Sequence, residues 1–314
     1  LVFYTNPTSA MNAVARALPL RLGDEILTTD HEYGAMDKMW DFICAKTGAV
    51  CVRRPIPLPV TDHAAFIEDL WAGVSERTRV LFISHITSPT ALIFPLAELC
   101  RRARAAGILT LVDGAHAPGQ IPLNLAELDP DIYTGTCHKW LCAPKGSAFL
   151  YAGPAAQPWL EPLIVSFGWG QNYPSPAEQF IGYHEWQGTR DIAAFLSVPA
   201  AIQFQAEHDW PRVRARCHEL LRQARRGIAE LTGLPPLCPD SPAWYAQMAA
   251  FPLPACDGAA LQRRLYEEHH IEVPIIEWGG RQFVRVSAQG YNIEEDTAML
   301  LRGLEALLPR MAAG

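Results

Sequence analysis

The chain has 314 residues, 49% of them hydrophobic, which fits one large domain and a smaller one with a substantial core. With 26 basic and 33 acidic residues the net charge is −7, and no basic run appears, which argues against nucleic-acid binding. No apolar run approaches the roughly 20 residues needed to span a bilayer, and no signal peptide opens the chain. Eight scattered cysteines are typical of reduced thiols in a cytosolic protein.

The first 150 residues alternate short apolar runs with longer amphipathic ones. The apolar runs are "LVFYTN", "DEILTTD", "AVCVRRPI", "TRVLFISHI" and "ILTLVDGAH", and a helical pattern follows each of the first four. Two further strands are expected at "DPDIYTGTCH" and "SAFLYAG". This alternation predicts an α/β fold with a buried, mainly parallel sheet covered on both faces. Because "LVFYTN" resembles a strand already under way, we expect an N-terminal segment to precede it in the parent protein.

The second half of the chain has a different composition. Residues 151–191 are rich in Pro, Gly, Trp and Tyr, which predicts a long, ordered, functional loop. A long helical stretch is expected at roughly 192–232, followed by short strands, the helix "GAALQRRLYEEHH" and the closing helix "EEDTAMLLRGLEALLPRM". We therefore expect a large α/β domain over residues 1–205. Residues 206–314 are expected to form a linking helix and a small α+β domain.

Polar residues follow the predicted strands, where ligands of parallel α/β sheets bind. Thr8 and Ser9 lie between a strand and a helix, so they can bind a phosphate or simply cap the helix. Asp113 ends an apolar strand, where an ionised carboxylate requires a partner such as a pyridinium nitrogen; capping of the next turn is the alternative. His116 can reach the hydroxyl of the same ring.

Lys139 is one of only four lysines among the 26 basic residues. It follows an apolar strand and precedes Trp140, where burial would favour a neutral, nucleophilic amine; an ion pair at the strand end is the alternative. Thr136 and His138 supply hydrogen-bond donors suited to a phosphate. Arg285, in a short strand, can bind a carboxylate in a bidentate manner or form a surface ion pair. Amine, acid, phosphate donors and arginine together predict pyridoxal 5′-phosphate (PLP) and an amino-acid substrate.

Seven motifs in order carry a family resemblance over residues 6–292. They are "NPTSAMN", "TDHEYGAM", "SHITSPTALIFP", "DGAHAPGQ", "CHKWLCAPKGSAFLY", "HEWQGTRD" and "RVSAQGYN". Through them the chain resembles the class V aminotransferase and cysteine desulfurase superfamily of PLP fold type I, most closely its isopenicillin N epimerase-like branch. The resemblance implies a mainly parallel seven-stranded sheet with flanking helices, a small C-terminal α+β domain and a cytoplasmic homodimer with shared active sites.

The resemblance also implies residue roles. Lys139 matches the lysine that forms the Schiff base, Asp113 the acid at the pyridine nitrogen, and His31 the residue stacked on the pyridine face. His116 matches the residue near the ring hydroxyl, and Arg285 the arginine that binds the substrate α-carboxylate. Ser88 stands near the cofactor where desulfurases carry Asn. The phosphate-binding positions are matched by Thr8, Ser9, Thr136, His138 and, from the partner subunit, Thr189.

Several reactions remain open at this stage. An epimerase requires a second acid or base besides Lys139, for which Tyr33 and Tyr291 are candidates, although both are more typical of structural residues. A C–S lyase requires a leaving group at Cβ, and an aminotransferase must accept a second keto acid. Persulfide formation is disfavoured because "VPIIEWGGRQFVR" has no cysteine and Cys256 lies far upstream. We expect epimerisation.

Other classes of protein are disfavoured. A catalytically silent PLP-fold dimer would not need Lys139, Asp113 and Arg285 together. No GxGxxG follows the first strand, which argues against a NAD enzyme, and neither HxxxH nor CxxC spacing supports a zinc site.

Overall fold

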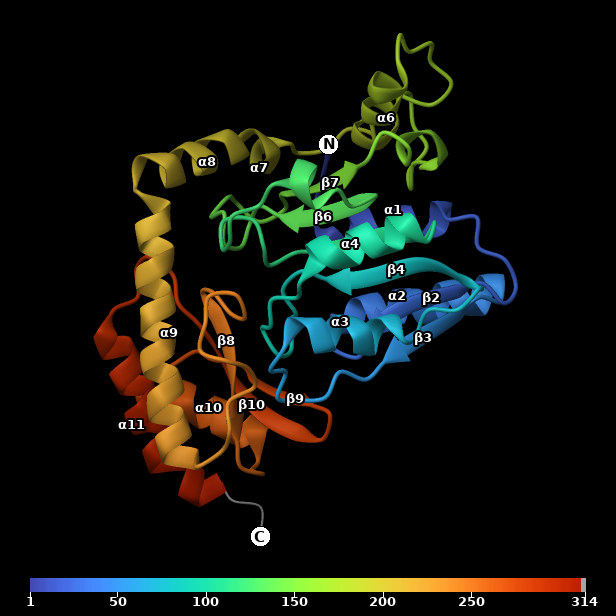
Figure 1. Ribbon diagram of the computed structural model, residues 1–314. Coiled ribbons are helices and arrows are strands. Elements are labelled where there is room, and N and C mark those ends of the chain that lie inside the picture. The colour runs from blue at the N-terminus through green and yellow to red at the C-terminus, as the bar shows by residue number, and fades with distance from the viewer. Residues whose placement is uncertain (312–314) are drawn as a thin grey trace. The chain divides into compact units, whose positions relative to one another are not determined.

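The computed structural model describes residues 1–311 and divides into two compact units (Figure 1). The N-terminal unit comprises Leu1–Ile56, His63–Ile86 and Phe94–Glu207. The C-terminal unit takes the short segments Pro57–Asp62 and Thr87–Ile93 together with the chain from His208 onward.

A seven-stranded sheet forms the centre of the N-terminal unit, in the order β1-β7-β6-β5-β4-β2-β3. The strands β2 to β6 pair in parallel, whereas β7 is antiparallel to both β1 and β6. The predicted α/β class and mainly parallel seven-stranded sheet are thus confirmed. The strands are β1 Val2–Tyr4, β2 Glu25–Thr29, β3 Val50–Arg54, β4 Thr78–Ser84, β5 Leu109–Gly114, β6 Ile132–Thr136 and β7 Ala148–Ala152.

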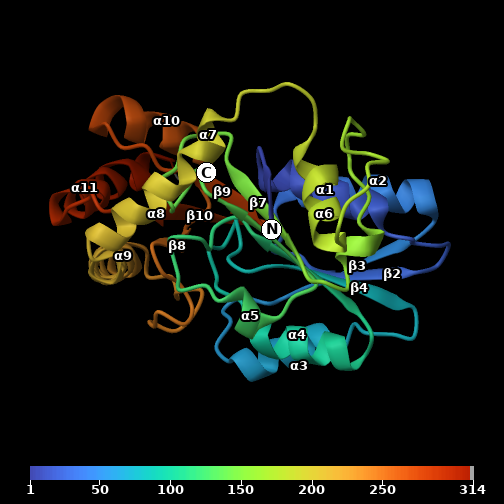
Figure 2. The ribbon, with the colours of Figure 1, turned by 90° about the horizontal axis from the view of Figure 1, so that it is seen from above.

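Helices cover both faces of this sheet. Figure 2 shows α1 and α2 on one face and α3 and α4 on the other. The central strands are buried on both sides, which explains their nearly continuous Val, Ile and Leu content. The helices of this unit are α1 Pro7–Ala17, α2 Gly34–Thr47, α3 His63–Trp71, α4 Leu96–Ala105, α5 Leu125–Leu128, η1 Gln157–Trp159, α6 Pro176–Glu185, α7 Ala193–Leu196 and α8 Val198–Glu207.

Two expectations for residues 151–232 are wrong in detail. The expected loop contains η1 and α6, and Ser175 caps α6 by accepting a hydrogen bond from the Glu178 amide. The expected long helix is three helices, α7, α8 and α9, because Pro199 and Pro211 lack the amide hydrogen needed to continue a helix. Asp209, just before α9, has a left-handed backbone with φ of 46°.

The C-terminal unit is a three-stranded antiparallel sheet with the order β8-β10-β9, and helices pack against it. The expected α+β composition and closing helix are confirmed. Its elements are α9 Trp210–Thr232, β8 Met248–Leu253, α10 Gly258–His269, β9 Ile275–Trp278, β10 Arg281–Ser287 and α11 Glu294–Met311. Among the described residues, no helix is both long and apolar enough to cross a lipid bilayer.

Candidate active site

The carboxyl ends of four adjacent parallel strands bring most of the predicted residues of the N-terminal unit to one edge of its sheet. His31 lies two residues beyond β2, Asp113 is the penultimate residue of β5, Thr136 ends β6, and Lys139 follows it. Thr8 and Ser9 follow β1, which has the same direction as β6 because both are antiparallel to β7. The topology therefore gathers residues that are 130 positions apart in the sequence.

Lys139 lies in the turn after β6. Its Nζ is 3.1 Å from His116 Nε2. The expectation that this side chain is buried is wrong for the single chain, because Lys139 is exposed while the adjacent Trp140 is buried. A neighbouring imidazole, rather than an apolar pocket, is what the fold provides for the amine.

His116 is oriented by the indole of Trp140, whose Nε1 donates to His116 Nδ1 over 3.3 Å. An indole nitrogen can only donate, so Nδ1 accepts and a neutral His116 carries its proton on Nε2, the atom that faces Lys139. Nε2 can then donate to the Lys139 amine only when that amine is neutral. The close approach depends on Gly119 (φ 82°), where an added Cβ would lie 2.5 Å from the Trp140 carbonyl oxygen.

Asp113 is a buried carboxylate, with 4% of its surface exposed. Its Oδ1 accepts a 2.9 Å hydrogen bond from the amide of Ala115. Burial raises the pKa of Asp113, while that amide and the nearby positive charge of Lys139 lower it. A buried acid of this kind at a strand end suits a cationic partner such as a protonated pyridine nitrogen.

Thr136 carries the clearest sign of a missing partner. Its Oγ1 is buried and, among the described residues, has no hydrogen-bond partner. A buried hydroxyl in that state is costly unless a ligand satisfies it. Together with Asp113, this hydroxyl shows that the residues present fit PLP, which has a ring nitrogen and a phosphate to satisfy them.

The other residues predicted to bind the phosphate have contacts within the protein or lie next to residues that do. His138 Nδ1 lies 2.7 Å from the carbonyl oxygen of Ser147 and 3.2 Å from the amide nitrogen of the same residue, and burial lowers the pKa of the ring. Thr8 and Ser9 lie in the first turn of α1, but Asn6 caps the helix by accepting from the Ser9 amide at 2.8 Å. Neither of the two residues is the cap.

His31 is completely buried, and its Nε2 lies 2.9 Å from the carbonyl oxygen of Ile56. Burial lowers the pKa of this imidazole. The ring is therefore neutral near pH 7, a state compatible with stacking on an aromatic ring. Thr189 is exposed, in the turn between α6 and α7.

Arg285 and Ser88 come together within the C-terminal unit. Arg285 Nη1 donates to the Ser88 carbonyl and lies 3.2 Å from its hydroxyl. Within the described residues Arg285 forms no ion pair, its Nε is buried without a partner, and burial lowers the pKa of the guanidinium. The alternative of a surface ion pair is wrong, and a guanidinium in this state suits an anionic ligand.

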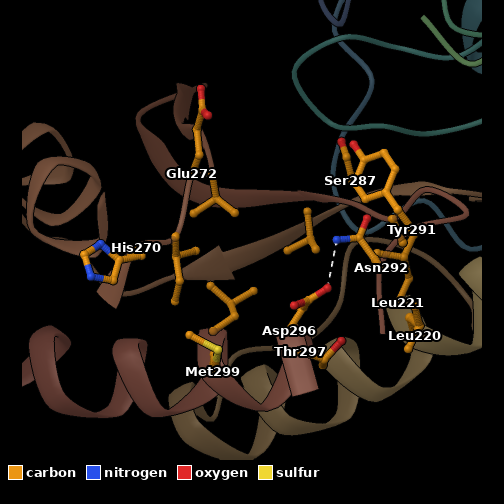
Figure 3. A pocket seen from close by; sticks show the side chains of 15 residues that line it. Leu220, Leu221, His270, Glu272, Ser287, Tyr291, Asn292, Asp296, Thr297 and Met299 are labelled. Atoms are coloured by element: carbon orange, nitrogen blue, oxygen red, sulfur yellow. Dashed lines mark hydrogen bonds between the residues drawn. The ribbon is translucent and has the colours of Figure 1, made fainter. Parts of the chain in front are cut away.

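The C-terminal unit also contains a cavity of about 390 Å³, shown in Figure 3. Val286 and Ser287 of β10, Tyr291 and residues of α9 and α11 line it. Tyr291 is a candidate for the second acid or base, but none of the residues predicted to bind the cofactor or the α-carboxylate lines this cavity. Asp296 is already occupied there, accepting from the side chain of Asn292 and the amide of Ile293, both at 3.0 Å. These contacts cap the start of α11.

Sequence reasoning missed Glu32, a second buried acid at the same edge of the N-terminal sheet. The signal was available in "TTDHEYG", since an acidic residue directly after a buried strand and a candidate histidine is costly without a function or a partner.

Comparison with known proteins identifies the family of this chain. The model of the class-V aminotransferase family matches residues 1–300. The isopenicillin N epimerase of Streptomyces clavuligerus is 40% identical, over 98% of this chain and 80% of that protein. The putative L-cysteine desulfhydrase 1 of Oryza sativa subsp. japonica is 29% identical, over 91% and 64%. A crystal structure of a cysteine desulfurase from Escherichia coli shares the fold, with a TM-score of 0.82 and 22% identity over 99% of this chain and 79% of that one. The chain therefore belongs to the class-V aminotransferase family and is a PLP-dependent enzyme.

Proposed function

We propose that this enzyme epimerises an amino-acid substrate at Cα, with isopenicillin N as the first candidate. The proposal is supported by the 40% and 37% identity to two isopenicillin N epimerases over 98% of the chain. The observation that carries the chemistry is the amine of Lys139 held 3.1 Å from His116 on the same sheet edge as the buried Asp113. PLP, when bound, supplies an electron sink for the charge left at Cα.

The residues of this chain take the following roles in the proposal. Lys139 attaches the cofactor and then moves the Cα proton. Asp113 holds a proton on the ring nitrogen, and His116 donates from Nε2 to the ring hydroxyl. His31 packs on the ring face, and Arg285 binds the substrate α-carboxylate. The remaining cofactor-binding residues in the proposal are Thr8, Ser9, Ser88, Thr136, His138 and Thr189 of the partner subunit.

A second acid or base is needed to return the proton from the opposite face. Tyr33 and Tyr291, the two candidates, are both exposed, at 47% and 81%. Tyr33 follows β2 at the carboxyl edge, beside His31 and before α2, so we favour it over Tyr291 for this role.

Elimination at Cβ is the second candidate function, supported by the L-cysteine desulfhydrases among the relatives. A desulfurase-type reaction is less compatible with Cys256. That thiol is buried, it donates to Gln282 Oε1, and burial raises its pKa, so a reactive thiolate is disfavoured.

The deciding experiment is incubation of the holoenzyme with isopenicillin N or L-cysteine in heavy water. We expect deuterium at Cα together with inversion of configuration for isopenicillin N. Pyruvate and sulfide from L-cysteine, with no inversion, would favour the lyase. If Tyr33 is the second base, Tyr33→Phe should keep deuterium exchange at Cα on one face but lose inversion of configuration. Tyr291→Phe should keep both exchange and inversion.

We also propose a homodimer that shares its active sites. An apolar surface over residues 163–204 supports it, because many large side chains are exposed there, including Phe167 at 77%. The exposed Thr189 lies in this segment. Phe167→Asp should shift the holoenzyme to monomers in sedimentation velocity, while Leu22→Asp, at a position 86% exposed elsewhere, should not. A Phe167→Asp protein that stays dimeric at low micromolar concentration would contradict this interface.

A further inference from the structure

Glu32 is a buried carboxyl beside the proposed cofactor residues, with 5% of its surface exposed. It lies in the turn after β2, directly after His31. Its Oε1 accepts from the Thr29 hydroxyl at 2.7 Å, and its Oε2 accepts from the amide and the hydroxyl of Ser84 at 2.9 and 2.5 Å. All three donors are uncharged, and when Glu32 is protonated its Oε1 can donate to the Thr29 hydroxyl oxygen instead of accepting from it.

Strand register places this carboxyl next to Asp113. Ser84, the last residue of β4, is the direct parallel partner of Asp113 on β5. Paired residues of adjacent strands point to the same face of a sheet, so the Ser84 hydroxyl and the Asp113 carboxyl are neighbours on one face. Glu32, bonded to that hydroxyl, is then one side chain away from Asp113.

The two acids cannot both be ionised at low cost, since each is buried and they repel each other. Burial raises the pKa of Glu32 to about 8, the hydrogen bonds from Ser84 and Thr29 oppose that increase, and the charge of Asp113 adds to it. Lys139 acts on Asp113, whose pKa its positive charge lowers. The charge of the pair is therefore more stable on Asp113 and the proton more stable on Glu32.

We propose that Glu32 is a positioning residue that acts on the cofactor ring through Asp113, the pair holding one negative charge on Asp113 and one proton on Glu32 at neutral pH. This inference rests on the proposed contact between Asp113 and the pyridine nitrogen. When the pH rises, Glu32 releases its proton to solvent. The second negative charge then strengthens the hold of Asp113 on the proton at the ring nitrogen.

Other titratable groups around the pair do not mimic this behaviour. Burial lowers the pKa of His31, and that of His85 to about 4, so both stay neutral as the pH rises above 7. Burial raises the pKa of Tyr133, whose hydroxyl contacts His85 Nδ1, well above its usual value. Lys139 and His116 face each other over 3.1 Å, and Glu32→Gln and Ser84→Ala leave both residues unchanged.

The test uses the holoenzyme and two spectroscopic measurements between pH 6 and 9.5. The cofactor absorption of the wild type should show a transition near pH 8, which Glu32→Gln should lose while keeping the wild-type spectrum at pH 7. Isotope-edited infrared spectroscopy should show the C=O band of a protonated carboxyl at pH 7 in the wild type, and Glu32→Gln should lack it. Glu25→Gln is the matched control, because Glu25 is also 5% exposed and begins β2, the strand that Glu32 follows.

A second variant protects the test against misfolding of Glu32→Gln. Ser84→Ala removes a donor that favours the charged carboxylate, so the transition should move to higher pH by about one unit. The proposal fails if Glu32→Gln keeps either the protonated-carboxyl band or the transition, or if Ser84→Ala moves it to lower pH. If Asp113→Asn leaves the cofactor spectrum unchanged, the proposed contact of Asp113 with the ring fails, while the infrared band still shows whether Glu32 holds the proton.

Discussion

The two edges of the seven-stranded sheet differ in how completely the protein supplies hydrogen-bond partners to buried polar groups. At the amino edge, Glu25 Oε2 accepts from the Ser75 hydroxyl and Oε1 accepts from both Nε and Nη2 of Arg77, and these hydrogen bonds lower the pKa of Glu25. Nearby, Thr110 is fully satisfied by the Asp131 carboxylate, at 2.8 Å from its amide and 3.0 Å from its hydroxyl. The protein itself supplies the hydrogen-bond partners of both residues.

At the carboxyl edge the matching is incomplete. Asp113 has one amide donor to its carboxylate, Glu32 has only uncharged donors, and the Thr136 hydroxyl has no partner among the described residues. Burial raises the pKa of both acids instead of lowering it. The contrast indicates that the amino edge is built for stability, whereas the carboxyl edge is built to receive a ligand that completes its interactions.

The largest effects on activity and stability are expected when one buried acid at each edge, Asp113 or Glu25, is replaced by its amide. Asp113→Asn should slow Cα deuterium exchange on the order of 10²- to 10³-fold, as when a preorganised electrostatic partner is removed. It should leave the cofactor-free protein at least as stable, because a buried charge is lost. Glu25→Gln should do the reverse, costing about 1.5–3 kcal/mol in urea unfolding and leaving the exchange rate unchanged. Equal loss of stability in both variants would remove the distinction between the edges.

The pH dependence of stability should differ in sign between the edges. The folded-state pKa of Glu32 is raised to about 8, so the folded protein holds a proton that the unfolded chain releases above its ordinary value. The stability that Glu32 contributes should therefore fall as the pH rises from about 4.5 to 8, by roughly 1.4 kcal/mol per pH unit for one proton. His85 and His184, whose pKa values burial lowers to about 4, give slopes of the opposite sign below the ordinary pKa of histidine, so the contribution of Glu32 is the difference between the wild type and Glu32→Gln. The pKa of Glu25 is lowered, so its contribution is lost as the pH falls below the ordinary value for glutamate.

Urea unfolding of the cofactor-free protein between pH 4 and 9 measures both slopes. Compared with the wild type, Glu32→Gln should lose the decrease in stability that Glu32 causes between about pH 4.5 and 8, and Glu25→Gln should lose the decrease that Glu25 causes below the ordinary pKa of glutamate. A stability difference between the wild type and Glu32→Gln that grows in favour of the wild type from pH 5 to 8 would contradict the expected sign.

The smallest effect is expected at two buried threonines. Thr136→Val removes a hydroxyl that the cofactor phosphate satisfies in the proposed site, so PLP affinity should fall by roughly 2- to 12-fold, the equivalent of 0.5–1.5 kcal/mol, with no loss of stability. Thr110→Val removes a satisfied hydroxyl and should lower stability by a similar amount without changing PLP affinity. Fluorescence titration with PLP and urea unfolding distinguish the two. Unchanged affinity in Thr136→Val would place the phosphate elsewhere.

Sequence patterns predicted the strands of the large sheet, because buried parallel strands are continuous apolar runs followed by helices. They also placed Asp113 at the end of an apolar strand, where burial of an ionised carboxylate costs free energy unless the carboxylate has a partner. The exposure of Lys139 and its contact with His116 could not be predicted, because they depend on how the turns after β5 and β6 fold against each other. Glu32 was missed because its neighbour Ser84 is 52 residues away in sequence.

Gly119 limits the mutational tolerance of this enzyme at a position that has no side chain. A methyl group there would meet the main chain of Trp140 at 2.5 Å, and backbone, unlike a flexible side chain, cannot turn aside. The turn would have to retreat, separating the imidazole of His116 from the amine that it faces. In a saturation library selected for activity, we expect glycine alone to survive at position 119, while the exposed positions of the same turn vary.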